Sequence, residues 1–346
     1  MLGRRVSTGK FTVLWSNQET YAGPCLLIGK RIITQVHDKD NLGFAVDLLT
    51  GKRITRPHPI TGEAIPWEYS RNYGCNTALG SAHMLTFRSA AAGYYDLKGD
   101  GGTGNFGGFR SGCTSNLIPA GGVLCAPDYT RTCTCAYQNQ VSLALVHMPE
   151  AEMWTFQKLK ASGLPTSRLG LNFGAPGDRF GPDGTLWLDY PSVGGPGPEV
   201  KVEKFLEKPE YLRHHASRME GGDLRWVAAS GVKGSGEIAI VLVPPQEKGK
   251  EGPAGGGGER HYTVSLVFAE IEGCPAGRRT FDVSVQGQTR LQEFDIAKEA
   301  GGAYRTVIRE FKDVPVAGAL KVSLTQRGEL PPLLCGLKIV EGGRGF

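Results

Sequence analysis

Two aromatic and two acidic residues lie close together ahead of a loop rich in glycine and proline. They are Asp183, Trp187, Asp189 and Tyr190, and the loop covers residues 191–197. Aromatic rings stack on the C–H faces of sugars, and carboxylates accept hydrogen bonds from hydroxyl pairs, so these side chains could bind a carbohydrate. The alternative interpretation places Trp187 in a hydrophobic core and Tyr190 over the end of a strand.

The eight cysteines suggest either metal or disulfide chemistry. A zinc site would have to draw on Cys113, Cys125, Cys133, Cys135 and His147. The single residue between Cys133 and Cys135 is tighter than the usual zinc knuckle. Disulfides, in an exported parent, or buried thiols are therefore favoured for Cys75, Cys113, Cys125, Cys133 and Cys135. Cys274, expected in a loop, and Cys335, expected in a core strand, are predicted to be free.

The motifs of common enzyme classes give no support for catalysis. Gly102-Thr-Gly104-Asn-Phe-Gly107 spells a dinucleotide-binding fingerprint, but that motif works only between a strand and a helix. The surrounding residues 100–109 predict a loop instead. The sequence has no Gly-x-Ser-x-Gly elbow, no His-Glu-x-x-His pair and no phosphate loop. We therefore predict no catalytic residue, no metal ligand and no cofactor.

The composition favours a turn-rich β protein with two domains. The 346 residues include 50 glycines and 21 prolines, yet 40% of the chain is hydrophobic. The net charge of +5 is spread along the chain without a basic and aromatic stripe, so no nucleic-acid partner is expected. No apolar run is long enough for a membrane span or a signal peptide. The cysteine density nevertheless indicates an exported parent, in the periplasm or at the cell surface.

The first half contains an approximate repeat of short strands. Residues 24–37 predict a hairpin around a Gly-Lys turn, and residues 43–52 add an apolar run that ends in Thr-Gly-Lys. An echo of this pattern follows at residues 81–97, and a looser copy covers residues 116–146. Units of about 40 to 50 residues built from short strands are typical of propeller blades.

The turn Val46-Asp47-Leu-Leu-Thr-Gly-Lys52 resembles the end of a blade in the pyrroloquinoline-quinone-like (PQQ-like) propeller repeat. The resemblance implies a partial β-propeller of about three blades over residues 1–148. Because closure needs about four blades or more, sheet edges would stay unpaired. We therefore expect that the chain is a fragment, or that missing blades or a protein partner complete the propeller. A fragment of a quinoprotein dehydrogenase is an alternative.

A change of composition separates this half from a second domain. Residues 149–167 mix charged and apolar side chains and are interpreted as a connector, and residues 168–342 predict a second set of strands. Within that set, the charged and glycine-only tract 246–260 predicts a mobile loop. Trp226 is expected in the core. A solvated surface, rather than a ligand pair, is expected for Tyr211, His214 and His215.

Four motifs of the second domain occur in the order found in malectin. They are Tyr262-x-Val-x-Leu-x-Phe-Ala-Glu270, Arg279-x-Phe-Asp-Val-x-Val-x-Gly287, Phe294-Asp-Ile296 and the final strand 332–339. This half therefore resembles the malectin family of carbohydrate-binding domains. The resemblance implies a jelly-roll-like β-sandwich whose loops at one end hold a sugar. In that family an aromatic pair follows the first motif, and the matching positions here are Glu272 and Gly273.

These observations predict an all-β protein in which a partial propeller is followed by a jelly-roll-like β-sandwich. Alternate strand residues, such as Tyr262, Leu266 and Phe281, should point into the sandwich core. The expected function is non-catalytic binding of a carbohydrate or cell-surface polymer, and a protein–protein interaction scaffold is the alternative. The predicted binding residues are Asp183, Trp187, Asp189, Tyr190 and Glu272.

Overall fold

The computed structural model describes residues 2–7, 10–18, 22–35, 42–109, 116–127, 142–148, 150–160, 162–245 and 258–342. β-Strands dominate these residues, which confirms the predicted all-β class. Within the described ranges, helix is limited to η1 (Ala216–Arg218), α1 (Arg225–Ala228) and α2 (Ile296–Ala300). None of these described helices has the length and apolar character needed to cross a membrane.

The chain divides into two compact units. Unit 1 comprises residues 1–58 and 63–158, and unit 2 comprises residues 59–62 and 159–346. The short segment 59–62 belongs to unit 2 because the Ile60 carbonyl accepts backbone hydrogen bonds from Ser167 and Arg168. The change between the units falls inside the predicted connector. Part of that connector is ordered strand, since β16 (Thr155–Phe156) pairs with a sheet of unit 1.

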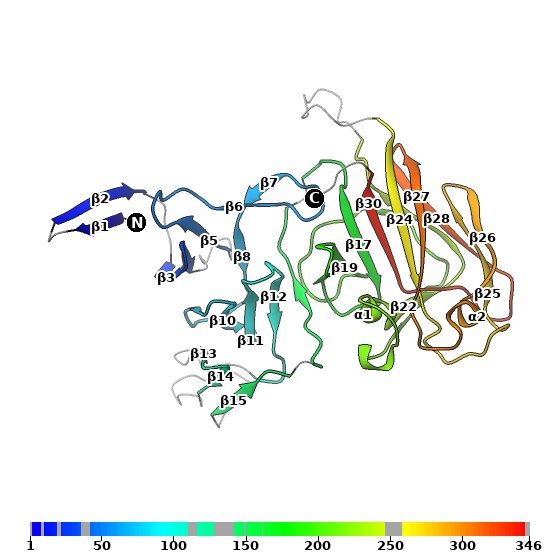
Figure 1. Ribbon diagram of the computed structural model, residues 1–346, viewed down its shortest axis with the longest axis horizontal. Coiled ribbons are helices and arrows are strands. Elements are labelled where there is room, and N and C mark those ends of the chain that lie inside the picture. The colour runs from blue at the N-terminus through cyan, green and yellow to red at the C-terminus, as the bar shows by residue number, and fades with distance from the viewer. Residues whose placement is uncertain are drawn as a thin grey trace. The chain divides into compact units, whose positions relative to one another are not determined.

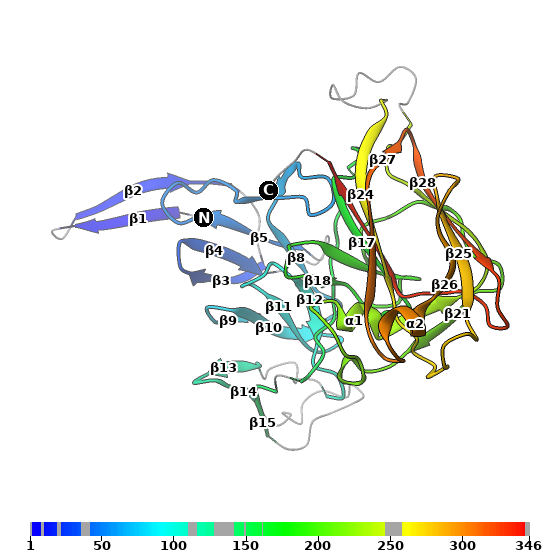
Figure 2. The same ribbon diagram turned by 45° about the vertical axis from the view of Figure 1, so that its right-hand side comes forward.

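The described part of unit 1 contains three larger antiparallel sheets that follow one another along the chain (Figure 2). The first has the strand order β3 (Ala22–Ile28), β4 (Arg31–Gln35), β5 (Leu42–Asp47), β8 (Glu68–Ser70). The second has the order β16, β12 (Gly102–Asn105), β11 (Ala91–Asp96), β10 (Met84–Ser89), β9 (Leu79–Gly80). The third has the order β13 (Ile118–Ala120), β14 (Val123–Ala126), β15 (Leu143–Val146). Two separate hairpins are β1 (Leu2–Ser7) with β2 (Lys10–Ser16), and β6 (Thr55–Pro57) with β7 (Ala64–Pro66).

The apolar cores of unit 1 lie between neighbouring sheets. One cluster joins Ile33 and Tyr69 of the first sheet to Leu85 and Tyr95 of the second. A smaller cluster brings the second and third sheets together through Ala92, Leu117, Leu124 and Ala126. Each sheet is thus stabilised by burial against the next one. The hairpin predicted over residues 24–37 is confirmed as β3 and β4, whereas the propeller of about three blades stays a prediction.

Two turns of unit 1 repeat the same hydrogen bonds. After β5, Asp47 Oδ1 accepts hydrogen bonds from the backbone N–H groups two and three residues further on, at 3.0 and 2.8 Å. After β11, Asp96 Oδ1 does the same at 3.0 and 3.1 Å. Short acidic side chains stabilise tight turns in this way because they satisfy backbone donors that the turn leaves unpaired. The similarity between residues 43–52 and 81–97 therefore includes the same turn, which an aspartate side chain stabilises in both segments.

The prediction of a loop over residues 100–109 is wrong. Residues Gly102–Asn105 form β12, which lies between β11 and β16, and no helix follows it in residues 106–109. Close packing requires glycine here, since a Cβ at Gly104 would lie 2.4 Å from the Tyr94 hydroxyl oxygen. Two of the four residues of this strand are glycine and none has a large apolar side chain, so it has no apolar periodicity and the sequence pattern missed it.

Unit 2 is a β-sandwich of two larger sheets with a smaller third sheet (Figure 1). The first sheet has the order β18 (Arg179–Phe180), β19 (Leu186–Tyr190), β17 (Arg168–Phe173), β30 (Gly336–Glu341), β24 (Arg260–Phe268), β27 (Val307–Val316). The second has the order β20 (Val202–Lys204), β23 (Gly236–Val241), β28 (Ala319–Gln326), β25 (Thr280–Val285), β26 (Gln288–Asp295). The third has the order β21 (Glu210–Arg213), β22 (Ser230–Lys233), β29 (Leu333–Leu334).

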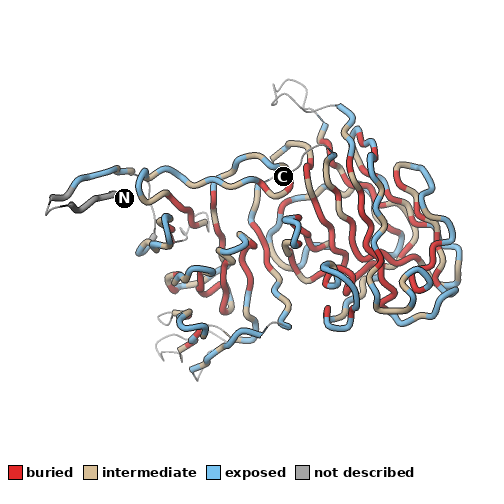
Figure 3. Tube along the Cα trace, viewed as in Figure 1, coloured by how far each residue is buried: buried red, intermediate tan, exposed pale blue. Residues whose placement is uncertain are grey.

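The core of unit 2 lies between its two larger sheets, where long stretches of strand are buried (Figure 3). The inward positions predicted for Tyr262, Leu266 and Phe281 are confirmed, since none of them exposes any surface. The Phe268 ring of β24 meets the Phe281 ring of β25 at a centroid distance of 6.0 Å. The predicted mobile loop 246–260 lies outside the described residues as far as residue 257.

Candidate functional site

Trp187, a predicted sugar-binding residue on β19, is a core residue. It exposes 0% of its surface, and its ring meets that of Trp226 edge to face at a centroid distance of 5.9 Å. Neighbouring strands make room for the indole with glycine, since a Cβ at Gly170 or Gly336 would lie 2.4 or 2.9 Å from it. A sugar therefore has no access to Trp187. The same contact bears out the core position expected for Trp226, which is also buried.

The two predicted aspartates have structural partners at opposite ends of β19. Asp183 precedes the strand, accepts a hydrogen bond from the Thr185 N–H and pairs with Lys338 Nζ at 3.2 Å. Burial raises the pKa of Asp183, but the bonds from Thr185 and Lys338 outweigh it and lower the pKa overall. Asp189 is buried, and its Oδ2 accepts two backbone hydrogen bonds, each of 2.7 Å, from the loop 191–197. Asp189 thereby fixes the path of that loop.

Tyr190 belongs to an aromatic cluster that consists of Phe173, Tyr190, Phe205 and Tyr211. The Tyr190 and Phe205 ring centroids are 4.8 Å apart, and the Phe205 and Tyr211 rings are nearly parallel at 6.4 Å. Phe173 is buried, while the other three rings are half-buried. Burial raises the pKa of Tyr211 to about 12, so its hydroxyl stays protonated. Half-buried rings with hydroxyl groups at their edges suit the C–H face and the hydroxyls of a sugar.

Of these four rings, only that of Tyr190 was predicted from the sequence to bind a ligand. Phe205 stands within the charged run 203–210, and Tyr211 was expected on a solvated surface. Neither residue lies in an alternating apolar pattern that would mark it. Their contact with Tyr190 depends on how three sheets pack together, since Tyr190 ends β19, Phe205 directly follows β20 and Tyr211 lies in β21.

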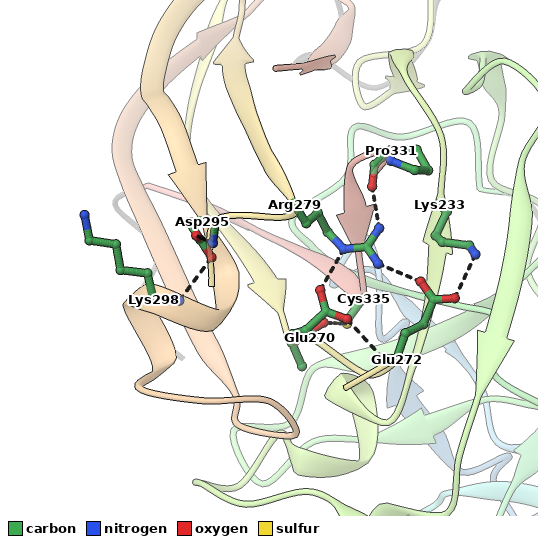
Figure 4. Close-up of polar contacts among 10 residues, drawn as sticks. Lys233, Glu270, Glu272, Arg279, Asp295, Lys298, Pro331 and Cys335 are labelled. Carbon is green, nitrogen blue, oxygen red and sulfur yellow. Dashed lines mark hydrogen bonds and ion pairs between the residues drawn. The ribbon is translucent and has the colours of Figure 1, made fainter. Parts of the chain in front are cut away.

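Glu272 belongs to a charged network centred on Arg279, and the network consists of Glu210, Lys233, Glu270, Glu272 and Arg279. Figure 4 shows the part of this network around Arg279, Glu272 and Lys233. The Arg279 and Glu270 side chains are only 2% and 1% exposed, and Arg279 Nε donates to Glu270 Oε2 at 2.7 Å. Arg279 also donates to Glu272 Oε2 at 2.6 Å and to the Pro331 carbonyl. Because a buried charge without a partner is very costly, these groups stabilise the fold only together.

Lys233 carries the network to the surface. Its Nζ lies 2.9 Å from Glu272 Oε1 and 3.0 Å from Glu210 Oε1. Burial raises the pKa of Glu272, but the hydrogen bonds from Lys233 and Arg279 outweigh it and lower the pKa overall. Burial lowers the pKa of Lys233, and its bonds to the two glutamates raise it overall. Both groups are therefore charged near neutral pH, and Glu272 is engaged by two cations.

The five predicted binding residues do not form one site. Glu210 of β21 belongs to the charged network, whereas its neighbour Tyr211 belongs to the aromatic cluster. Successive residues of a strand point to opposite faces, so the network and the cluster lie on opposite faces of β21. Tyr190 and Glu272 are thus separated, and Asp183 lies at the other end of β19. The aromatic cluster is the candidate site.

The described cysteines do not form a metal centre. Cys25, Cys125, Cys274 and Cys335 are free thiols in the structure, which confirms the prediction for Cys274 and Cys335. The pairing expected for Cys125 is not found, and Cys113, Cys133 and Cys135 lie outside the described residues. Burial raises the pKa of Cys335 to about 12. Within the described residues, no three His, Cys, Asp or Glu side chains are grouped to hold a metal ion.

Sequence comparison relates part of unit 2 to a known family. Residues 256–329, which hold β24 to β28, match the family described as Malectin domain. Two probable leucine-rich repeat receptor-like serine/threonine-protein kinases of Arabidopsis thaliana are similar. One is 36% identical over 78 residues, which are 21% of this chain and 8% of the kinase. The other is 33% identical over 95 residues, 23% of this chain and 9% of the kinase. Unit 2 therefore contains a malectin-like domain, and the chain matches less than a tenth of either relative.

Solved structures show only weak likeness. The Arabidopsis thaliana ANXUR2 extracellular domain has 12% identity and a TM-score of 0.38, over 51% of this chain and 49% of that one. A Bacteroides uniformis β-glucuronidase has 13% identity and a TM-score of 0.36, over 63% of this chain and 22% of that one. At these TM-scores the likeness supports no conclusion about function.

Proposed function

We propose that unit 2 is a non-catalytic domain that binds a carbohydrate or a cell-surface polymer at the aromatic cluster. The observation that carries the proposal is the group of half-buried rings at Tyr190, Phe205 and Tyr211 in a malectin-like domain. Rings held by mutual packing lose little side-chain entropy when a ligand stacks on them, which favours recognition of weakly binding sugars. The loop 191–197, fixed by Asp189, would border the site.

A glycan array probed with the full chain and with Tyr190→Ala and Tyr211→Ala tests this proposal. We expect binding that weakens about tenfold or more in either variant, because each one removes a ring of the cluster. Tyr73→Ala is the matched control, since Tyr73 is an exposed tyrosine of unit 1 and should leave binding unchanged. An array without hits, or hits that survive both substitutions, would contradict the proposal.

We also propose that the three sheets of unit 1 are blades of a partial PQQ-like propeller that presents unit 2 or docks to another chain. The shared cores between successive sheets and the repeated aspartate turns support this reading. Amide hydrogen exchange tests it. The edge strand β15 should exchange faster than the central strand β11, and a partner or further blades should protect β15. Slow exchange of β15 in the isolated chain would contradict the proposal.

A protein-interaction role is the second candidate function. The third sheet of unit 1 and the segment after it expose large apolar side chains, with Val146 73% and Met148 64% exposed. Such groups favour protein contacts when they lie together on a surface. The relatives of unit 2 are named receptor-like kinases, which supports a cell-surface location for the parent protein. Binding that depends on Val146 and not on Tyr211 would favour this second role.

A further inference from the structure

A guanidinium group is held in place beside the loop that follows β24. His214 Nε2 lies 2.9 Å from the Ile271 carbonyl oxygen, which can only accept, so Nε2 carries the hydrogen and Nδ1 is an acceptor. Arg218 Nη1 donates to this Nδ1 at 3.0 Å, and Nη2 donates to the Tyr304 hydroxyl at 3.3 Å. The guanidinium carbon also lies 5.0 Å from the centroid of the Tyr304 ring. Three contacts therefore fix the orientation of an exposed side chain.

The charges around Arg218 are otherwise balanced. Glu220 pairs with Arg305 at 3.0 Å, and the glutamates of the charged network pair with Lys233 and Arg279. Arg218 bonds only to uncharged groups, and no carboxylate of the described residues lies within ion-pairing distance of it. Since one N–H on each terminal nitrogen is engaged, the second on each remains for a ligand. An oriented cation without a counter-charge is suited to bind an anion.

Tyr304 connects this cation to the loop at Glu272. The Tyr304 N–H donates to the Glu270 carbonyl at 2.9 Å, and the backbone has a positive φ of 60°. A Cβ at Gly273 would lie 3.1 Å from the Tyr304 hydroxyl. The Tyr304 ring, which comes from the loop after α2, therefore lies beside Gly273.

We propose that Arg218, held by His214 and Tyr304, binds the acidic group of an anionic carbohydrate. The ligand class is a glycan with a uronic-acid carboxylate or a sulfate ester, since either group accepts hydrogen bonds from the two outer guanidinium N–H groups. The inference rests on the proposed function only in that the ligand is a carbohydrate. His214 and Tyr304 are positioning residues, because they act through the orientation of Arg218.

A glycan array with uronic-acid glycans, sulfated glycans and their neutral counterparts tests the inference on the full chain. We expect acidic glycans to bind and Arg218→Gln to weaken that binding about tenfold or more. Comparing the uronic-acid glycans with the sulfated glycans shows whether Arg218 binds a carboxylate or a sulfate ester. Lys321→Gln is the matched control, because it removes the same charge from an exposed position of β28 and should change nothing.

The outcomes separate this inference from the proposed function. Binding of neutral and acidic glycans alike, unchanged by Arg218→Gln, would overturn the anion site and leave carbohydrate binding intact. An array without any hit would overturn both. Arg218 is exposed, so Arg218→Gln should fold with an unchanged melting temperature. Salt should weaken acidic-glycan binding in the parent chain more than in Arg218→Gln, because exposed charge pairs are screened. Equal salt dependence in both would count against the proposal.

Discussion

Unit 1 and unit 2 bury their tryptophans in different ways. In unit 1, Trp67 lies in a core between two small sheets, and its Nε1 donates to Asp100 Oδ1 at 2.7 Å. In unit 2, Trp187 lies in a wide sheet, is surrounded by other strands, and its Nε1 has no hydrogen-bond partner among the described residues. Trp67 thus combines apolar burial with a hydrogen bond to a side chain, whereas Trp187 is held by apolar packing among the described residues.

Among the substitutions that distinguish the two units, Arg279→Ala should cause the largest loss of stability. The substitution leaves the buried carboxylate of Glu270 without its partner, so we expect the unfolding transition of unit 2 to lose about 3–5 kcal/mol. Urea unfolding followed by fluorescence measures it. Arg327→Ala, which breaks the exposed pair with Asp282, should lower the stability far less, because solvent screens exposed ion pairs. Equal losses in the two variants would show that the charged network is not the stabilising feature assigned here.

Replacing Trp67 or Trp187 by phenylalanine tests whether the two cores differ in this way. Both substitutions remove ring volume, but only Trp67→Phe also removes a hydrogen bond, the one to Asp100. We therefore expect Trp67→Phe to destabilise unit 1 by about 1 kcal/mol more than Trp187→Phe destabilises unit 2. Calorimetry of the separate thermal transitions gives both values. A larger loss in Trp187→Phe would reverse the contrast between the two cores.

Acid should destabilise unit 2 through Glu272. Its pKa in the folded state is lowered from the ordinary value of 4.5, so the unfolded state binds more protons near that pH. The stabilisation that Glu272 provides is complete above pH 4.5. It is lost as the pH falls through the pKa that Glu272 has in the folded state. Melting temperatures of the parent chain and Glu272→Gln across this range measure it. Glu272→Gln should lose less stability on acidification than the parent chain. Part of the acid sensitivity remains in the variant, because the pKa values of Asp183 and Asp282 are also lowered in the folded state.

The smallest effect should come from the repeated turns of unit 1. Asp96→Ala removes the acceptor for two backbone N–H groups after β11. Water can replace it at this exposed turn, so we expect unit 1 to lose less than about 1 kcal/mol and unit 2 to be unchanged. Thermal unfolding of both units in one scan provides the measurement and its internal control. A change in the transition of unit 2 would mean that the units do not unfold independently.

Much of the fold could be predicted from local patterns. The alternation around Tyr262 and Phe281 predicted inward positions that the structure confirms, because a half-buried strand requires that period. The glycine-rich strand β12 could not be predicted, because glycine has no side chain to reveal a period. The final predicted strand divides at Cys335, where β29 pairs with β22 and β30 with β17 and β24. The point where a chain passes from one sheet to another does not alter the pattern of apolar and polar residues.

The candidate site was predicted only in part. Tyr190 was found from its residue type, and its partners Phe205 and Tyr211 were not, because their contact depends on strands of three different sheets. Glu272 was placed correctly after its strand. Its engagement by Lys233 could not be foreseen, since that lysine comes from β22.

The class of fold follows from the sequence alone, since the spacing of apolar residues and turns is a local property of each strand. It also placed a malectin-like domain in the second half, because the motifs there occur in order along the chain. Which side chains are buried and which are held in one orientation depends on the tertiary structure. Trp187 became core because Gly170 and Gly336 make room for it, and Arg218 was oriented by its neighbour His214 and by Tyr304 of a distant loop. Access and orientation depend on contacts between distant segments, and those contacts exist only in the folded chain.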